Sequence, residues 1–226
     1  MGFPGAVLWC LGAIHVANTR QCAMSEAQAL VVVIDDDPDI RNALQGLLET
    51  VDLQAALFAT ATEFLASKRP QSPCCIVVDV RLPGLSGLDF QQQLARENIP
   101  IPVIFITGHG DIPMSVRAMK AGAVEFLTKP LRDQDVLDAI QAALRHDRAR
   151  LEDERKVADL RNRHDSLTAR EREVMALLVS GRVNKQIAAE AGISEVTVRL
   201  HRGQIMRKTR ASSLADLIRI ADKIKS

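Results

Sequence analysis

The sequence predicts an α/β domain with a doubly wound, five-stranded parallel sheet, followed by a small all-α helix-turn-helix domain. Three observations carry this prediction. Short β-branched runs alternate with amphipathic helical stretches from residue 30 to residue 147. Polar residues follow the ends of these runs. After residue 166 the pattern is helical throughout and the charge becomes basic.

The first domain is expected to contain five strands and five helices. Its first strand is the apolar run at 30–34, and the next helix, at 39–51, places its apolar residues on one face. Further strands are expected near residues 54–58, 74–79, 102–106 and 124–127, with helices between them and a last helix from about residue 132.

The last helix continues into a charged stretch that contains neither Gly nor Pro. Alternating charges are typical of a solvated helix, so residues 148–165 are interpreted as a helical linker. Leu144, Leu151 and Ala158 recur every seven residues, which leaves a short coiled coil as the alternative. The predicted organisation is an extension at 1–23, a domain at 24–147, this linker, and a second domain at 166–226.

The second domain opens with a helix start signal, because Thr168 is followed three positions later by Glu171 in a capping-box pattern. A helix at 184–191, a turn at Gly192 and a further helix carrying Arg199 and Arg202 describe a helix-turn-helix. The core of this domain is expected to contain Leu177, Ile187, Val198 and Ile205.

The charge of the chain is divided between the two domains. The total is +1, but residues 24–159 carry −7 and residues 160–226 carry +7. A small basic domain indicates a polyanionic partner, and nucleic acid is favoured over a membrane surface. Chance clustering of solvated charges is the alternative. No apolar run approaches the roughly 20 residues that cross a bilayer, so no membrane partner is expected.

The chain has four cysteines, none of them at metal-ligand spacing: Cys10, Cys22, Cys74 and Cys75. They are expected to be free thiols in a reducing compartment, which indicates a cytoplasmic protein. Residues 3–16 form an apolar stretch that resembles the core of a signal peptide but lacks a preceding basic residue. We expect Met24 to be the natural start, with residues 1–23 non-native or disordered. A targeting segment is the alternative.

Polar side chains follow the expected strands at one edge of the sheet. Asp35 and Asp36 follow the first strand, Asp79 the third, Thr107 the fourth and Lys129 the fifth. In open α/β sheets the carboxyl ends of the strands meet at the ligand-binding crevice, so these side chains are expected to converge. Three carboxylates, a hydroxyl and an ammonium group suit a Mg²⁺ ion and a phosphoryl group.

This set of residues has a direct chemical interpretation. An aspartate beside Mg²⁺ can attack phosphorus and form an acyl phosphate, while Lys129 neutralises the developing charge. Each residue alone also has an ordinary explanation as a helix cap, a turn residue or a surface lysine. Their joint occurrence at successive strand ends favours the phosphoryl site.

The motifs at these strand ends resemble two-component response regulators, in particular the FixJ branch of the NarL/FixJ family. They are IDDDPD at 34–39, VDVRLPGLSG at 78–87, ITGHGDIPM at 106–114 and LTKP at 127–130. Residues 167–181, 184–188 and 193–202 resemble the LuxR-type helix-turn-helix. The resemblance implies a flavodoxin-like receiver domain followed by a LuxR-type DNA-binding domain.

The resemblance also implies which residues hold the metal and the phosphoryl group. Asp79 would be the phospho-acceptor. Asp36, Asp79 and the backbone carbonyl of Arg81 would bind Mg²⁺, with Asp35 acting mainly through water.

Three further residues would bind the phosphoryl group and transmit its presence. Thr107 would be the switch hydroxyl, Lys129 the phosphoryl clamp and Phe126 the switch aromatic. The Lys129–Pro130 bond would be cis, in keeping with the rule that cis bonds occur at proline.

Dimer and DNA contacts are assigned less directly. The candidates for a receiver dimer interface are Met114, Val116, Met119 and Lys120. Arg199 and Arg202 could reach guanine edges or phosphates, and Thr197 either, while Lys185, Arg207 and Lys208 suit phosphate. Gly203 lies in the expected recognition helix, where it lacks a side chain and leaves the register of base contacts open.

The function predicted from these residues is that of a phosphorylation-activated transcriptional regulator of a two-component system. Its expected partners are a sensor histidine kinase, double-stranded promoter DNA, RNA polymerase and a second copy of the chain. It is not expected to be an enzyme beyond its own phosphorylation and dephosphorylation. A haloacid-dehalogenase-type phosphatase is disfavoured, because Arg81 stands where that class has a second acid. A receiver that acts by protein contact or phosphate relay is the remaining alternative.

Overall fold

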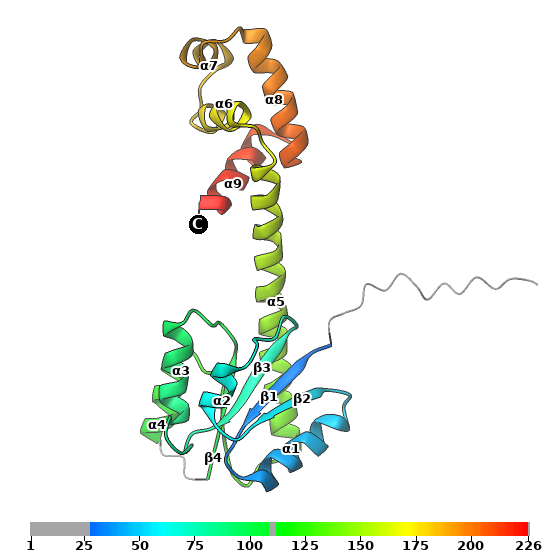
Figure 1. The fold of residues 1–226 in the computed structure, drawn as a ribbon, viewed down its shortest axis with the longest axis vertical. Coiled ribbons are helices and arrows are strands. Elements are labelled where there is room, and N and C mark those ends of the chain that lie inside the picture. Colours follow the sequence, from blue (N-terminus) through cyan, green and yellow to red (C-terminus); the bar gives the residue numbers. More distant parts are fainter. Residues whose placement is uncertain (1–27, 109–111, 226) are drawn as a thin grey trace, which may run out of the picture.

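The computed structural model describes residues 28–108 and 112–225, and within these ranges it contains a sheet domain, a long helix and a helical domain (Figure 1). The expected extension at 1–23 lies outside the described residues. The long helix starts in the sheet domain and ends in the helical domain. None of the described helices carries an apolar stretch long enough to cross a membrane.

The sheet has five parallel strands in the order β2-β1-β3-β4-β5. They are β1 (Leu30–Ile34), β2 (Gln54–Phe58), β3 (Cys74–Asp79), β4 (Val103–Thr107) and β5 (Glu125–Thr128). The strand order reverses at β1, which confirms the doubly wound arrangement. Strand β4 begins one residue later than expected because Pro102 has no N–H to donate to the ladder. The carbonyl of Pro102 still accepts a hydrogen bond from the amide of Ile76 at 2.9 Å.

Helices cover both faces of the sheet and enclose two apolar cores. On one face lie α1 (Pro38–Glu49) and the first half of α5 (Asp133–Asp165), and on the other lie α2 (Ala61–Ala66), α3 (Gly87–Arg96) and α4 (Ile112–Lys120). Within β1, Val31 and Val33 face the first core, while Val32 and Ile34 face the second. Because both faces are covered, the strands are continuous apolar runs.

Cys74 and Cys75 open β3 as free, buried thiols, as predicted. Burial raises the pKa of Cys74 to about 12, and it also raises the pKa of Cys75. Since the thiolate is the reactive form, burial disfavours reaction at these two side chains, which pack in the core.

Helix α5 is one unbroken helix of 33 residues, about 50 Å long. Its buried positions end at Asp147, and from 152 to 156 every residue is exposed. The boundary expected at residue 148 therefore coincides with a change in burial. Leu144 is buried within the sheet domain and Ala158 is exposed, so the seven-residue repeat does not form a continuous seam. This favours the plain linker over the coiled coil.

The helical domain consists of α6 (Ala169–Val179), α7 (Asn184–Ala191), α8 (Glu195–Thr209) and α9 (Leu214–Lys225). The capping box at the start of α6 is present. Gly192 ends α7 with φ +65°, a left-handed conformation that glycine adopts without a steric penalty. Ile187, Val198 and Ile205 are fully buried, whereas Leu177 packs at the edge of this core and is only half-buried.

Candidate functional site

The strand ends bring the predicted acidic, hydroxyl and ammonium groups together. Asp35 follows β1, Asp79 ends β3 and Thr107 ends β4, and the side chains of all three are buried. The amide of Lys129 donates to the carbonyl of Thr107 at 2.8 Å, which fixes Lys129 beside the end of β4. The Lys129–Pro130 peptide is cis, as expected.

Lys129 connects the two buried carboxylates. Its Nζ lies 2.7 Å from Oδ2 of Asp79 and 2.9 Å from Oδ2 of Asp35. Burial lowers the pKa of the Lys129 ammonium, but its hydrogen bonds to Asp79 and Asp35 outweigh this effect, and the net pKa is raised. The two carboxylates therefore favour the charged form of Lys129.

The backbone fixes the direction in which each carboxylate points. The amide of Asp37 donates to Oδ1 of Asp35 at 2.9 Å, and the amide of Arg81 donates to Oδ1 of Asp79 at 2.8 Å. In both residues Oδ2 is left to Lys129. Burial raises the pKa of Asp35, so this carboxyl depends on its cationic neighbour to stay ionised.

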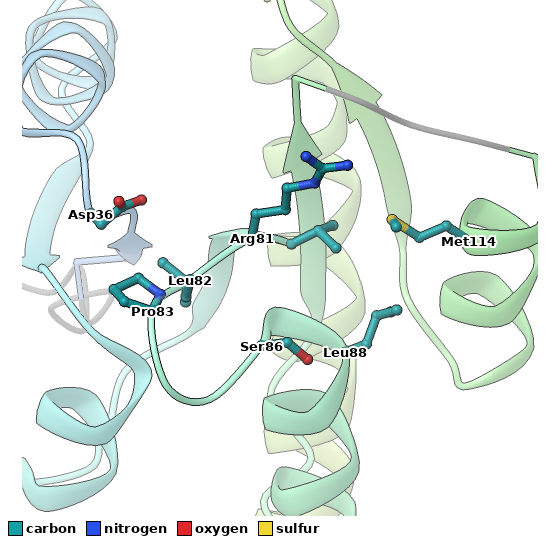
Figure 2. A pocket seen from close by; sticks show the side chains of 8 residues that line it. Asp36, Arg81, Leu82, Pro83, Ser86, Leu88 and Met114 are labelled. Atoms are coloured by element: carbon teal, nitrogen blue, oxygen red, sulfur yellow. The ribbon is translucent and has the colours of Figure 1, made fainter.

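An open pocket of about 580 Å³ lies beside Asp36 and Arg81 (Figure 2). Asp36 is exposed and lies at one end of it, Met114 from α4 lies at the other, and Arg81 lies between them in this view. The remaining lining side chains come from the β3–α3 segment and the start of α3: Val80, Leu82, Pro83, Ser86 and Leu88. The pocket gives a ligand access to the carboxyl end of β3.

The donor set fits a Mg²⁺ ion that keeps part of its water shell. Mg²⁺ is commonly bound by one or two carboxylates together with waters. Asp79 and Asp35 supply buried carboxylates, and Asp36 supplies an exposed one at the pocket. Within the described part of the chain, no group of three or more His, Cys, Asp or Glu side chains is placed to hold a metal ion by itself. Water or ligand oxygens would therefore complete the coordination of an ion held by these carboxylates.

The predicted switch residues occupy different environments. Thr107 is fully buried. Phe126 in β5 is half-buried, packs against the core between the sheet and α2–α4, and its ring centroid lies 6.4 Å from that of Phe105. The structure thus places Phe126 at the edge of the core, where its ring is in contact with both core and solvent.

Three of the four predicted dimer residues face outward on α4, and one does not. Val116 and Met119 are each 44% exposed, and Lys120 is also exposed. Met114 instead packs against the core and lines the pocket, because it lies one turn before the buried Ala118. Ile112, which was not among the predicted dimer residues, is 80% exposed. Ile112 lies four residues before Val116, and this spacing indicates that the two side chains share one face of the helix.

The predicted DNA contacts differ in how free their side chains are. Lys185 and Arg199 are exposed, whereas Arg202 is half-buried. Thr197 shares a hydroxyl–hydroxyl hydrogen bond of 2.8 Å with Ser194, and Arg207 donates to Gln204.

Lys208 has a partner inside the domain. Its Nζ lies 2.6 Å from Oε2 of Glu171 and 3.3 Å from the carbonyl of Ser166. The hydrogen bond from Lys208 lowers the pKa of the Glu171 carboxyl. Lys208 therefore ties the end of α8 to the end of α5 and the start of α6, which makes it a weaker phosphate-binding candidate than the sequence indicated.

Comparisons with known proteins agree with this arrangement. Residues 31–141 match the response regulator receiver domain, and residues 165–221 match the bacterial regulatory proteins of the luxR family. The chain is 53% identical over 200 residues to nodulation protein W of Bradyrhizobium diazoefficiens, covering 88% of each chain.

Two solved structures show the same combination of domains. The response regulator StyR is 45% identical, with a TM-score of 0.77 over 87% of this chain and 100% of that one. Full-length FixJ from B. japonicum is 39% identical, with a TM-score of 0.52 over 87% of this chain and 97% of that one. The chain belongs to the two-component response regulators that join a receiver domain to a LuxR-type DNA-binding domain, and these are transcriptional regulators.

Proposed function

We propose that a sensor histidine kinase phosphorylates this regulator on Asp79, and that phosphorylation promotes dimerisation through the receiver and binding to promoter DNA. The observation that carries the proposal is the geometry of Asp79. Its carboxylate is buried at a strand end and paired with Lys129 at 2.7 Å, and the next two residues, Val80 and Arg81, line an open pocket. Such an arrangement provides a nucleophile, a compensating charge and an approach path.

In the proposed transfer, a carboxylate oxygen of Asp79 attacks the phosphorus of a phosphohistidine. The P–O bond forms, the P–N bond breaks, and the imidazole leaves and takes up a proton. Lys129 holds the phosphoryl oxygens, and the buried hydroxyl of Thr107 donates to them. Later attack by water on phosphorus releases phosphate and restores Asp79.

When bound, Mg²⁺ supplies positive charge to the phosphoryl oxygens. Asp36, Asp79 and the carbonyl of Arg81 would hold it, and Asp35 would act mainly through water. The reaction is therefore a self-catalysed modification of this chain.

An apolar groove beside Lys129 suits the kinase. It has a volume of about 270 Å³ and lies between α1 and the start of α5, lined by Ile40, Leu44, Leu47, Pro130 and Leu131 among others. Grooves of this kind receive the apolar face of a partner helix. Docking there would bring a kinase histidine to the end of the sheet that carries Asp79.

The exposed face of α4 suits the dimer. Ile112, Val116 and Met119 form an apolar stripe at helical spacing, with Lys120 beside it. Movement of Thr107 toward the phosphoryl group and of Phe126 into the space behind it would change the adjacent surface. Phosphorylation can favour the dimer only by the difference in its interaction with the two states.

The basic helical domain supplies the output of the switch. A dimer presents two copies of α8 and therefore fits paired half-sites in promoter DNA. RNA polymerase is the proposed further partner, and the cytoplasm, where promoter DNA lies, is the proposed location.

The test compares the full chain with its Asp79→Asn variant, each with and without acetyl phosphate and Mg²⁺. Molecular mass in solution and retention of promoter DNA at two salt concentrations are measured. The wild-type chain should become dimeric and bind DNA more tightly, and Asp79→Asn should show neither change. Asp52→Asn, at an exposed turn far from the site, is the matched control and should behave as wild type.

If all states bind DNA equally, the phosphorylation switch is wrong, although DNA binding stands. If only the mass changes and no DNA is retained, the receiver acts by protein contact or relay. If wild type and Asp79→Asn respond alike to acetyl phosphate, Asp79 is not the acceptor.

A further inference from the structure

We propose that α8 reads thymine methyl groups in its DNA site through the exposed apolar side chains of Val196 and Leu200. This inference rests on the DNA-binding function and extends it to a base class. The base contacts predicted from the sequence were all polar, whereas the structure also exposes two apolar side chains on α8.

Val196 is 60% exposed and Leu200 is 66% exposed, although both are large apolar residues in a well-packed domain. They lie one turn apart on α8 and so occupy the same face. The opposite face carries Val198, Ile205 and Thr209, which are buried in the core of the helical domain. The core therefore does not need Val196 or Leu200.

The same face continues at Gly203, three residues after Leu200. No atom lies within 4 Å of the position that a Cβ would occupy on Gly203. The surface beside Leu200 therefore has a gap that a base edge or a methyl group can fill. Arg199, next to Leu200, is exposed, and among the described residues no carboxylate forms an ion pair with it.

The polar candidates on α8 are less available. The hydroxyl of Thr197 is bonded to Ser194 and the ammonium group of Lys208 to Glu171. Arg202 lies one turn after the buried Val198 and is half-buried. Direct reading by this helix thus depends on two apolar side chains and Arg199.

Duplex DNA is the occupant that the charge favours. Residues 160–226 carry +7, Arg199 is adjacent to Leu200, and Arg207 lies about two turns further along α8. In the major groove, the apolar group at a base edge is the C5-methyl of thymine. An apolar surface set in a basic helix therefore fits A·T base pairs there.

The test removes one methyl group at a time. A duplex is enriched by the full wild-type chain from a randomised library, in parallel selections with and without acetyl phosphate and Mg²⁺. Each thymine of the enriched duplex is then replaced by uracil, which lacks only the C5-methyl. Wild type should lose about fourfold in affinity at one or two of these positions, the effect of a buried methyl-sized group.

Leu200→Ala should bind the thymine duplex about fivefold more weakly and should lose its sensitivity to uracil at a position where wild type is sensitive. Val196→Ala should do the same at a different thymine. Alanine raises helix propensity, so neither variant is expected to unfold α8. Val51→Ala, at another exposed apolar residue, is the control and should keep the wild-type uracil profile.

Three results would overturn the proposal. The first is a Leu200→Ala variant that keeps the full uracil penalty. The second is a wild-type chain that binds every uracil duplex as well as the thymine duplex, which leaves DNA binding intact. The third is a wild-type chain that enriches no duplex in either selection, which removes the DNA-binding function as well. Because one selection omits acetyl phosphate, loss of the phosphorylation response in a chain that still binds DNA does not produce any of these results.

Discussion

At the scale of single residues, Lys129 balances two buried carboxylates with one ammonium group. Replacing it with Met removes that charge and leaves Asp35 and Asp79 facing each other. We expect Lys129→Met to reduce the free energy of unfolding of the receiver by about 2 kcal/mol, less than for a fully buried pair because Lys129 is partly exposed. Added Mg²⁺ should restore part of the loss, since a cation can then occupy the acidic cluster. Urea denaturation with and without Mg²⁺ measures both effects.

Lys156→Met is the control for this prediction, because Lys156 pairs only with exposed carboxylates on the linker. Its stability should lie within about 0.5 kcal/mol of wild type and should respond to Mg²⁺ as wild type does. An unchanged stability of Lys129→Met without Mg²⁺ would contradict the electrostatic role given to Lys129.

Gly203 offers a second test at the residue scale. A methyl group added there meets no neighbouring atom, so Gly203→Ala should stabilise α8 by about 1 kcal/mol through helix propensity alone. It should also weaken DNA binding, because the added methyl group fills the gap beside Leu200. Thermal unfolding and DNA titration separate the two effects.

Gly46→Ala in α1 is a matched control, because its added methyl group is equally free of contacts. It should gain a similar stability without any loss of DNA affinity. A lower free energy of unfolding for Gly203→Ala than for wild type would contradict the open space found around Gly203.

The positions of the candidate phosphoryl-site residues could be predicted one by one, because each functional group follows a strand and the parallel sheet brings strand ends together. Asp79 and Lys129 are examples. Lys208 and Leu200 could not be predicted in this way. An ion pair such as that of Lys208 with Glu171 depends on how α6 and α8 pack, and exposure of an apolar side chain depends on which helix face the core uses.

At the scale of secondary-structure elements, Asp147 of α5 connects this helix to β3. This fully buried carboxylate accepts from the amide of Cys74 at 2.9 Å, at the opposite end of β3 from Asp79. It also accepts from the guanidinium of Arg150 at 2.8 Å. Asp147 thus fixes the last buried turn of α5 to the strand that carries Asp79.

Asp147→Ala should therefore lower receiver stability by about 3 kcal/mol, because it leaves a buried amide and a partly buried guanidinium without their acceptor. Amide hydrogen exchange should also rise along the linker half of α5. Asp153→Ala, an exposed acid on the same helix, should change neither quantity appreciably. Equal effects of the two substitutions would contradict a specific role of Asp147 in fixing α5 to β3.

The elements themselves could largely be predicted from hydrophobic period and length. The strands matched to within one residue, and the shift of β4 has its cause in the missing N–H of Pro102. The seven-residue repeat was ambiguous because sequence spacing does not distinguish a coiled-coil seam from a helix face already buried in its own domain, as at Leu144.

At the scale of the whole molecule, an acidic receiver and a basic DNA-binding domain are joined by one continuous helix. The opposite net charges attract the two domains to each other, and the continuous helix α5 keeps them apart. The charge division predicted two domains and a polyanionic partner. It could not show that α5 continues without a break into contact with α8 and α9, because that depends on packing at the far end of the helix.

The unbroken helix sets how the DNA-binding domain is rotated about the helix axis relative to the receiver domain. Each residue inserted into α5 advances the DNA-binding domain by about 1.5 Å and turns it by about 100°. Two alanines placed between Arg155 and Lys156 should rotate α8 to nearly the far side and abolish phosphorylation-stimulated binding to paired half-sites. Seven alanines return the phase to within about 20° and should largely restore it. Retention assays on one enriched duplex compare the two insertions, and equal binding would show that the linker transmits no orientation. Changes in linker length that preserve activity should accordingly come in steps of whole helical repeats.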